Sequence, residues 1–127
     1  MEILLRNSGS KNIYDSWGHK KTAVPIFHLI RSFNVKKFVE IGVESGKLSL
    51  LIFNEFNDIY TYLVDISFQG CDLNSFRKYT QRFSVFNMKS TEASTYFQDG
   101  SLDMIYIDAS HLYEDIIEDL KIWSPKV

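Results

Sequence analysis

The stretch VEIGVESGKLSL, residues Val39–Leu50, decides the fold because a loop with two glycines joins two apolar runs there. The run that leads into the loop, Lys36–Gly42, is short and predicts a buried strand. The residues that follow, about Gly46–Phe56, leave little polar surface and predict a well-buried helix. We therefore expect a strand, a tight turn and a helix in succession.

The same pattern of a strand followed by a helix recurs three times along the chain. The predicted strands are Ile59–Ile66, Arg82–Asn87 and Leu102–Ala109, and the helices after them are about Leu73–Tyr79, Thr91–Phe97 and Leu112–Trp123. This alternation is typical of an α/β protein with a Rossmann-like, doubly wound parallel sheet. Here the sheet would be truncated after about four βα units.

The last predicted helix has two kinds of positions. Its apolar stripe consists of Leu112, Tyr113, Ile116, Ile117 and Leu120. Its acidic residues, which the helical period turns away from that stripe, are Glu114, Asp115, Glu118 and Asp119. We therefore expect the stripe to be buried and the acids to face solvent.

The chain is expected to be one globular domain with an extension before it. Its 127 residues are 45% apolar, which is enough for a core. A helix is predicted over Val24–Phe33, with Pro25 in its first turn. Residues 1–22 are predicted to be an N-terminal arm or lid, with His19, Lys20 and Trp17 as surface or lid residues. Residues 23–127 would form the Rossmann-like domain.

Composition and charge exclude several classes of protein. The formal net charge of -2 and the absence of a long basic run argue against nucleic acid as a partner. No apolar stretch is long enough for a signal peptide or a membrane span, so a cytoplasmic protein is expected. Cys71 is the only cysteine and is predicted to serve in packing, while Lys47 is predicted to lie on the surface.

The spacing in the glycine loop excludes two nucleotide-binding motifs. A phosphate-binding P-loop has four residues between its glycines, whereas three separate Gly42 from Gly46, and Leu48 follows Lys47 where Ser or Thr is required. A dinucleotide-binding loop needs glycine where Glu44 stands, and a carboxylate would repel a pyrophosphate. The loop instead favours a ligand that carries an ammonium group and little negative charge.

At this point the sequence resembles the class I S-adenosylmethionine-dependent methyltransferases. The segment EIGVESG is similar to their first motif, in the variant with three residues between the glycines. The segment around the fourth strand is similar to a subgroup that acts on small molecules and sugars. The residues that match its pattern there are Ile107, Asp108, His111, Tyr113, Asp119 and Leu120. The resemblance covers about Val35–Val127.

The resemblance implies S-adenosylmethionine as the cofactor and assigns Gly42, Gly46 and Glu40 to its methionine part. Glu40 would orient the loop or meet the ammonium group. Asp65, at the end of the second strand, would accept both hydroxyls of the ribose, and Ile66 would cover one face of the adenine. The alternatives are a tight turn in which Glu40 caps nearby N–H groups, and an N-terminal cap for Asp65.

The third unit would pass the edge of the adenine, so the resemblance makes Met88, Lys89 and Ser90 candidate contacts. Ordinary loop residues are the alternative. Asp108 is assigned both to the cofactor and to catalysis, and His111 is a candidate general base. The alternative role for Asp108 is a cap of the last helix.

The sequence stops at Val127, before the strands that normally complete the sheet in this family. The second set of acids used by metal-dependent members is missing as well, so a divalent metal is not favoured. The fourth strand, apolar on both faces, would be an unpaired edge. We therefore expect a second copy or another chain to cover it, giving a homo-oligomer or a complex, or else the sequence to be the cofactor-binding part of a longer protein.

Two functions follow from these expectations. The first is transfer of a methyl group from S-adenosylmethionine to an oxygen or nitrogen of a small-molecule acceptor. The alternative is a truncated, non-catalytic module of the same fold that binds the cofactor or a protein partner.

Overall fold

The computed structural model describes residues 2–6, 9–12, 19–109 and 112–127. Within these ranges the strands form one six-stranded sheet in the order β2-β1-β6-β3-β4-β5. The strands are β1 (Glu2–Leu5), β2 (Gly9–Asn12), β3 (Lys37–Ile41), β4 (Tyr60–Asp65), β5 (Phe83–Asn87) and β6 (Met104–Ile107). The α-helices are α1 (His19–Ser32), α2 (Lys47–Glu55), α3 (Ser90–Ala93) and α4 (Tyr113–Trp123). The 3-10 helices are η1 (Leu73–Arg82), η2 (Ser94–Tyr96) and η3 (Ser124–Lys126).

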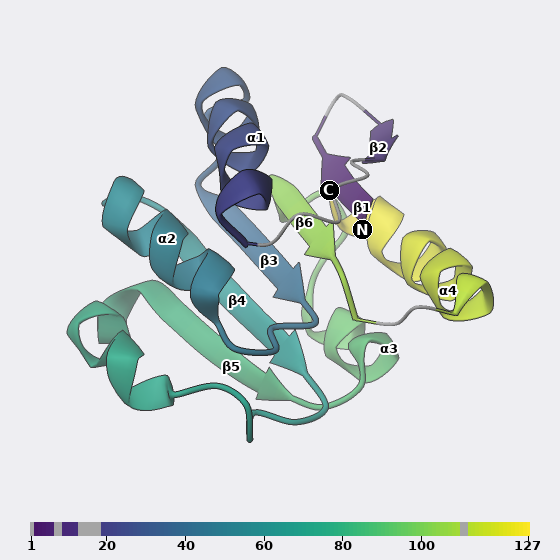
Figure 1. Ribbon diagram of the computed structural model, residues 1–127. Coiled ribbons are helices and arrows are strands. Elements are labelled where there is room, and N and C mark those ends of the chain that lie inside the picture. Colours follow the sequence, from purple (N-terminus) through teal and green to yellow (C-terminus); the bar gives the residue numbers. More distant parts are fainter. Residues whose placement is uncertain (1, 7–8, 13–18, 110–111) are drawn as a thin grey trace.

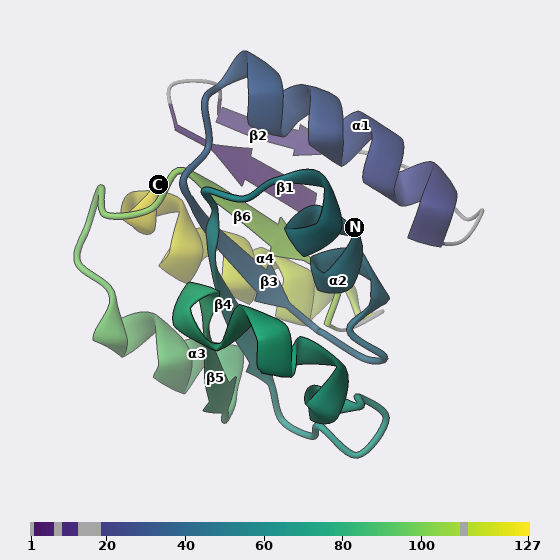
Figure 2. The ribbon, with the colours of Figure 1, turned by 90° about the vertical axis from the view of Figure 1, so that its left-hand side faces the viewer.

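The four predicted βα units are confirmed. Strand β3 pairs in parallel with β4 and with β6, and β4 pairs in parallel with β5. Figures 1 and 2 show the sheet between two layers, with α1 and α2 on one face and α3 and α4 on the other. Because the parallel strands all end at the same edge, the loops that follow them meet there.

The helices differ in detail from those predicted. The second unit forms η1, whose backbone leaves helical geometry at Tyr79, and the third is divided into α3 and η2. Helix α1 begins at His19 rather than at Val24, so Pro25 lies inside the helix and not in its first turn. His19 and Lys20 are therefore the first residues of α1. Trp17 lies outside the described residues.

The prediction that β6 is an unpaired edge is wrong. Strand β1 pairs with it antiparallel over its whole length, from Glu2 beside Ile107 to Leu5 beside Met104. Strand β2 then pairs with β1, so residues 2–5 and 9–12 of the predicted arm or lid are part of the sheet (Figure 1). This removes the physical reason for a partner chain at β6. A homo-oligomer stays an untested prediction.

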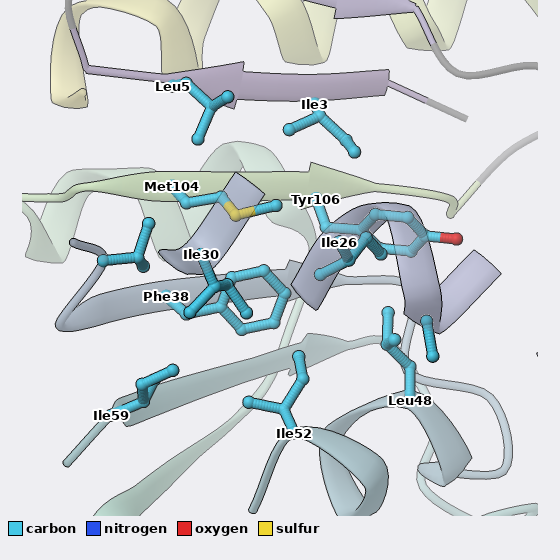
Figure 3. Close-up of a cluster of buried hydrophobic side chains, with 12 residues drawn as sticks. Ile3, Leu5, Ile26, Ile30, Phe38, Leu48, Ile52, Ile59, Met104 and Tyr106 are labelled. Carbon is cyan, nitrogen blue, oxygen red and sulfur yellow. The ribbon is translucent and has the colours of Figure 1, made fainter. Parts of the chain in front are cut away.

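A cluster of buried side chains joins β1 to the parallel strands and to α1 and α2 (Figure 3). Ile3 and Leu5 point into this cluster, and Leu4 packs into the cluster on the opposite face of the sheet. The strand thus buries side chains on both faces, as an interior strand does. Ile3, Leu4 and Leu5 are too few for a signal peptide, but they are enough to form a buried strand.

Replacing Ile3 with alanine is expected to lower the free energy of unfolding by about 2–4 kcal/mol, because its side chain is fully buried. Urea denaturation followed by circular dichroism measures the change. Val24→Ala, at a position that is 55% exposed, is the control and should change stability by less than about 0.5 kcal/mol. Equal effects of the two substitutions would show that β1 does not contribute to the core.

A third cluster lies under η1 and includes Cys71, Phe76, Phe53, Leu63 and Val43. Cys71 is buried there, which confirms its predicted packing role, and burial raises the pKa of its thiol.

Lys47 is exposed at the start of α2, as predicted. Within the part of the chain that the structure describes, no helix has the length and apolar character needed to cross a membrane. The cytoplasmic location stays a prediction.

Candidate functional site

The loop between β3 and α2 is held in an unusual backbone conformation. Gly42 and Gly46 have φ angles of 84° and 78°, and Glu44 between them has a φ of 52°. These values lie in the left-handed region, which glycine adopts far more readily than other residues. The Gly42 N–H donates to the carbonyl of Val64 in β4 (2.9 Å), so the loop is tied to the neighbouring strand.

Both glycines are also required by packing within the protein. A Cβ atom on Gly42 would lie 2.4 Å from the carbonyl oxygen of Asp108 and 2.6 Å from Cα of Ala109. A Cβ atom on Gly46 would lie 2.8 Å from Sγ of Cys71. The sequence explained these glycines by the approach of a cofactor. The structure adds a second reason, which is the approach of the segment after β6 and of the residues before η1.

Asp65, at the end of β4, binds the glycine loop from the side. Its Oδ2 accepts hydrogen bonds from the backbone N–H groups of Val43 (2.8 Å) and Glu44 (3.1 Å). Its Oδ1 accepts one from Ser67 N–H (3.1 Å), which is the local capping contact that the sequence allowed as an alternative. Since each carboxylate oxygen has about two lone-pair sites, Oδ1 keeps one for a further donor.

Glu40, in β3, is buried and only 2% exposed. It accepts a hydrogen bond from the hydroxyl of Ser49 in α2, which ties β3 to the helix after the loop; the predicted role in orienting the loop stays a prediction. Burial raises its pKa from the usual 4.5 to about 8; the Ser49 bond opposes this rise, and the nearby charges of Asp108 and Asp65 add to it. Glu40 does not line either of the hollows described below, so direct contact with an ammonium group stays a prediction.

Asp108 follows β6 and is exposed at the same edge of the sheet. Its Oδ2 accepts a hydrogen bond from the hydroxyl of Tyr106 (3.2 Å). Asp108 thus has a fixed position next to the glycine loop. His111, the candidate general base, lies outside the described residues.

Among the described residues, two hollows at this edge share Gly42, Asp65 and Ala109 in their linings. The large hollow, about 410 Å³, is lined by Ile41, Gly42, Val64, Asp65, Ile66, Met88, Lys89, Ser90, Thr91, Ala109, Asp115, Glu118 and Asp119. The small hollow, about 350 Å³, is lined by Gly42, Glu44, Asp65, Ser67, Gly70, Asp108 and Ala109. Asp65 therefore faces both, and most of the predicted site residues come together here.

The wall that α4 contributes to the large hollow was not predicted. Asp115 and Glu118 are exposed, as expected, but Asp119 is only 5% exposed, and all three line the hollow. Their spacing of three and four residues places them on one face of the helix. This spacing was the signal in the sequence that the three acids form one surface. Conversely, Tyr113, expected in the buried stripe, is 76% exposed, as Leu112 is at 67%.

The residues predicted to meet the adenine are also at the large hollow. Ile66 is 72% exposed at its rim, and Met88, Lys89 and Ser90 lie on the side formed by the start of α3. Among the residues described, no three side chains of the metal-binding types are grouped so that they could hold an ion. The metal requirement therefore stays unknown.

Comparison with known proteins places this site in a family. The profile of a family described as a methyltransferase domain matches residues 39–127, so the chain belongs to this family. Among solved structures it is similar to a protein from Staphylococcus aureus provisionally assigned as a caffeoyl-CoA O-methyltransferase, with a TM-score of 0.67 and 25% identity. That match covers 90% of this chain and 54% of the other, so this chain spans about half of its length. A search of curated proteins gave no match.

Proposed function

We propose that the chain binds S-adenosylmethionine across the two hollows and transfers its methyl group to an oxygen or nitrogen of a small molecule. Membership of the methyltransferase family supports the class of reaction. The observation that carries the proposal is the position of Asp65, which faces both hollows and keeps one acceptor site on Oδ1. That site can accept one ribose hydroxyl, rather than the two that the sequence suggested.

The residues present fit a cationic cofactor. Asp65 and Asp108 place two carboxylates at the small hollow, beside Glu44, where an ammonium or sulfonium group would be attracted. When bound, the cofactor supplies an activated methyl group. The contribution of the chain is to bind the cofactor, to orient it and to exclude water.

Asp108 is the described side chain best placed to act on the acceptor. Its carboxylate is exposed at the small hollow and is oriented by the Tyr106 hydroxyl. In our proposal it accepts a hydrogen bond from the hydroxyl or amine that attacks the methyl group, and so positions the nucleophile. His111 remains the proposed general base, which would take the proton of that group.

The second candidate function is binding of the cofactor without transfer. It is favoured by one observation: the chain aligns with only 54% of the methyltransferase-like structure that it resembles. The two functions share the cofactor site and differ in whether an acceptor is methylated. A scan of hydroxylated and amine acceptors for release of S-adenosylhomocysteine distinguishes them.

Calorimetric titration with S-adenosylhomocysteine tests the cofactor site directly. We expect the native protein to bind, and Asp65→Asn to bind about tenfold or more weakly, because the amide replaces a charged acceptor. Asp99→Asn, at a position that pairs with Lys126 away from both hollows, is the control and should keep native affinity. Absence of any binding heat in the native protein would contradict the proposal.

A further inference from the structure

Ser90 and Asp119 form a hydrogen-bonded pair in the wall of the large hollow. Ser90 is the first residue of α3, and Asp119 lies in the second half of α4. The Ser90 hydroxyl donates a hydrogen bond to Oδ1 of Asp119. Asp119 lines the hollow, yet it is only 5% exposed. A carboxyl group so deeply buried needs such a donor, and the bond opposes the rise in pKa that burial causes. The pair therefore fixes the direction of the Ser90 hydroxyl.

This direction determines what the hydroxyl offers to a ligand. A serine hydroxyl has one proton to donate and two lone pairs that accept. Because the proton is directed to Asp119, the oxygen presents only lone pairs to the hollow. The neighbouring carboxylates of Asp115 and Glu118 also only accept, and Lys89 is the cationic side chain of the described lining. The wall that includes Ser90 is thus suited to a ligand edge that donates hydrogen bonds.

We propose that Asp119 is a positioning residue that makes the large hollow selective for 6-aminopurines over 6-oxopurines, by holding the Ser90 hydroxyl as an acceptor. The inference rests on the proposed function: with the cationic group of the cofactor at the small hollow and its ribose at Asp65, which lines both hollows, the purine lies in the large hollow. The 6-amino group of adenine donates to Ser90 Oγ. A 6-oxo group at the same place turns its lone pairs toward those of Ser90, and the hydroxyl cannot rotate without leaving Asp119 unpaired.

The test compares two ligands that differ only at the base, S-adenosylhomocysteine and S-inosylhomocysteine. For the native protein, calorimetry should give about tenfold to a hundredfold tighter binding of the adenosyl compound, the range expected for one mismatched buried hydrogen bond. In Asp119→Asn the amide can donate to Ser90 Oγ and release the hydroxyl proton toward the ligand. The preference should then fall to within about threefold of unity.

Two further variants separate positioning from a merely structural role. Ser90→Ala removes the acceptor itself and should also reduce the preference, so the proposal remains testable if Asp119→Asn fails to fold. Glu114→Gln removes one charge from the same helix at an exposed position that does not line the hollow, and it should keep the native ratio. A structural defect would weaken both ligands equally and leave the ratio unchanged.

The outcomes also separate this inference from the proposed function. If the native protein binds neither compound, the cofactor site and the inference are both overturned. If it binds the adenosyl compound but shows no preference, or if the preference persists in Asp119→Asn and Ser90→Ala, the selectivity is overturned and the cofactor site stands. Loss of the preference in both variants, with the control unchanged, supports the role of Asp119.

Discussion

Replacing Gly42 with alanine is expected to lower the free energy of unfolding by more than about 3 kcal/mol, or to prevent folding. The added Cβ atom would lie 2.4 Å from the Asp108 carbonyl oxygen, at a φ of 84°. Neither side can yield easily, because Gly42 N–H is bonded to Val64 and Asp108 N–H is bonded to the Ile41 carbonyl (2.8 Å). Urea denaturation measures the loss.

Gly100 provides a matched control for this experiment. It also has a positive φ, 67°, but a Cβ atom there would meet nothing within 4 Å. Gly100→Ala should therefore lower the free energy of unfolding only by the cost of a positive φ for alanine, about 1 kcal/mol. If the two alanine variants lose the same stability, the contact between Gly42 and the segment after β6 does not matter, and our account of the loop is wrong.

The second large effect concerns Glu40, whose pKa burial raises to about 8. Since the usual value is 4.5, the folded protein binds this proton more tightly than the unfolded chain does. Stability should therefore fall as the pH rises from about 4.5 to 8 and level off above that range. Glu40→Gln removes the ionisation and should be more stable than the native protein at pH 9 by about 3–5 kcal/mol, with little difference near pH 5.

Denaturation midpoints measured from pH 5 to pH 9 for both proteins test this expectation. Ser49→Ala is an informative companion, because the Ser49 hydroxyl lowers the pKa of Glu40. Its loss should extend the decline in stability to higher pH. Parallel pH profiles for the native protein and Glu40→Gln would show that Glu40 does not titrate in this range.

The parallel part of the fold could be predicted from sequence because each unit carries its own signal. The apolar strand, the glycine loop and the buried helix of residues 36–56 are contiguous, and Asp65 stands at the end of the next strand. Local order and the common direction of parallel strands are then enough to bring the glycine loop, Asp65 and Asp108 to one edge.

The features that were missed depend on contacts between distant segments. Nothing local in residues 2–5 indicates that they pair with residues 104–107. In the same way, helical spacing identified the acidic face of α4 but could not reveal that the start of α3 packs against it and buries Asp119. Patterns of polarity say which residues share a face, and only packing decides what that face meets.

The pairing of β1 with β6 has a consequence for how the protein folds. The two strands are separated by about a hundred residues of chain, so joining them closes a long loop and is entropically costly until the elements between them have formed. Such non-local pairings slow folding. During synthesis β1 can pair with β2 early, but it leaves the ribosome long before β6 exists, so Ile3, Leu4 and Leu5 must wait for that partner strand. Residues 2–5 are therefore expected to take their place in the sheet late in folding, although they are made well before β6.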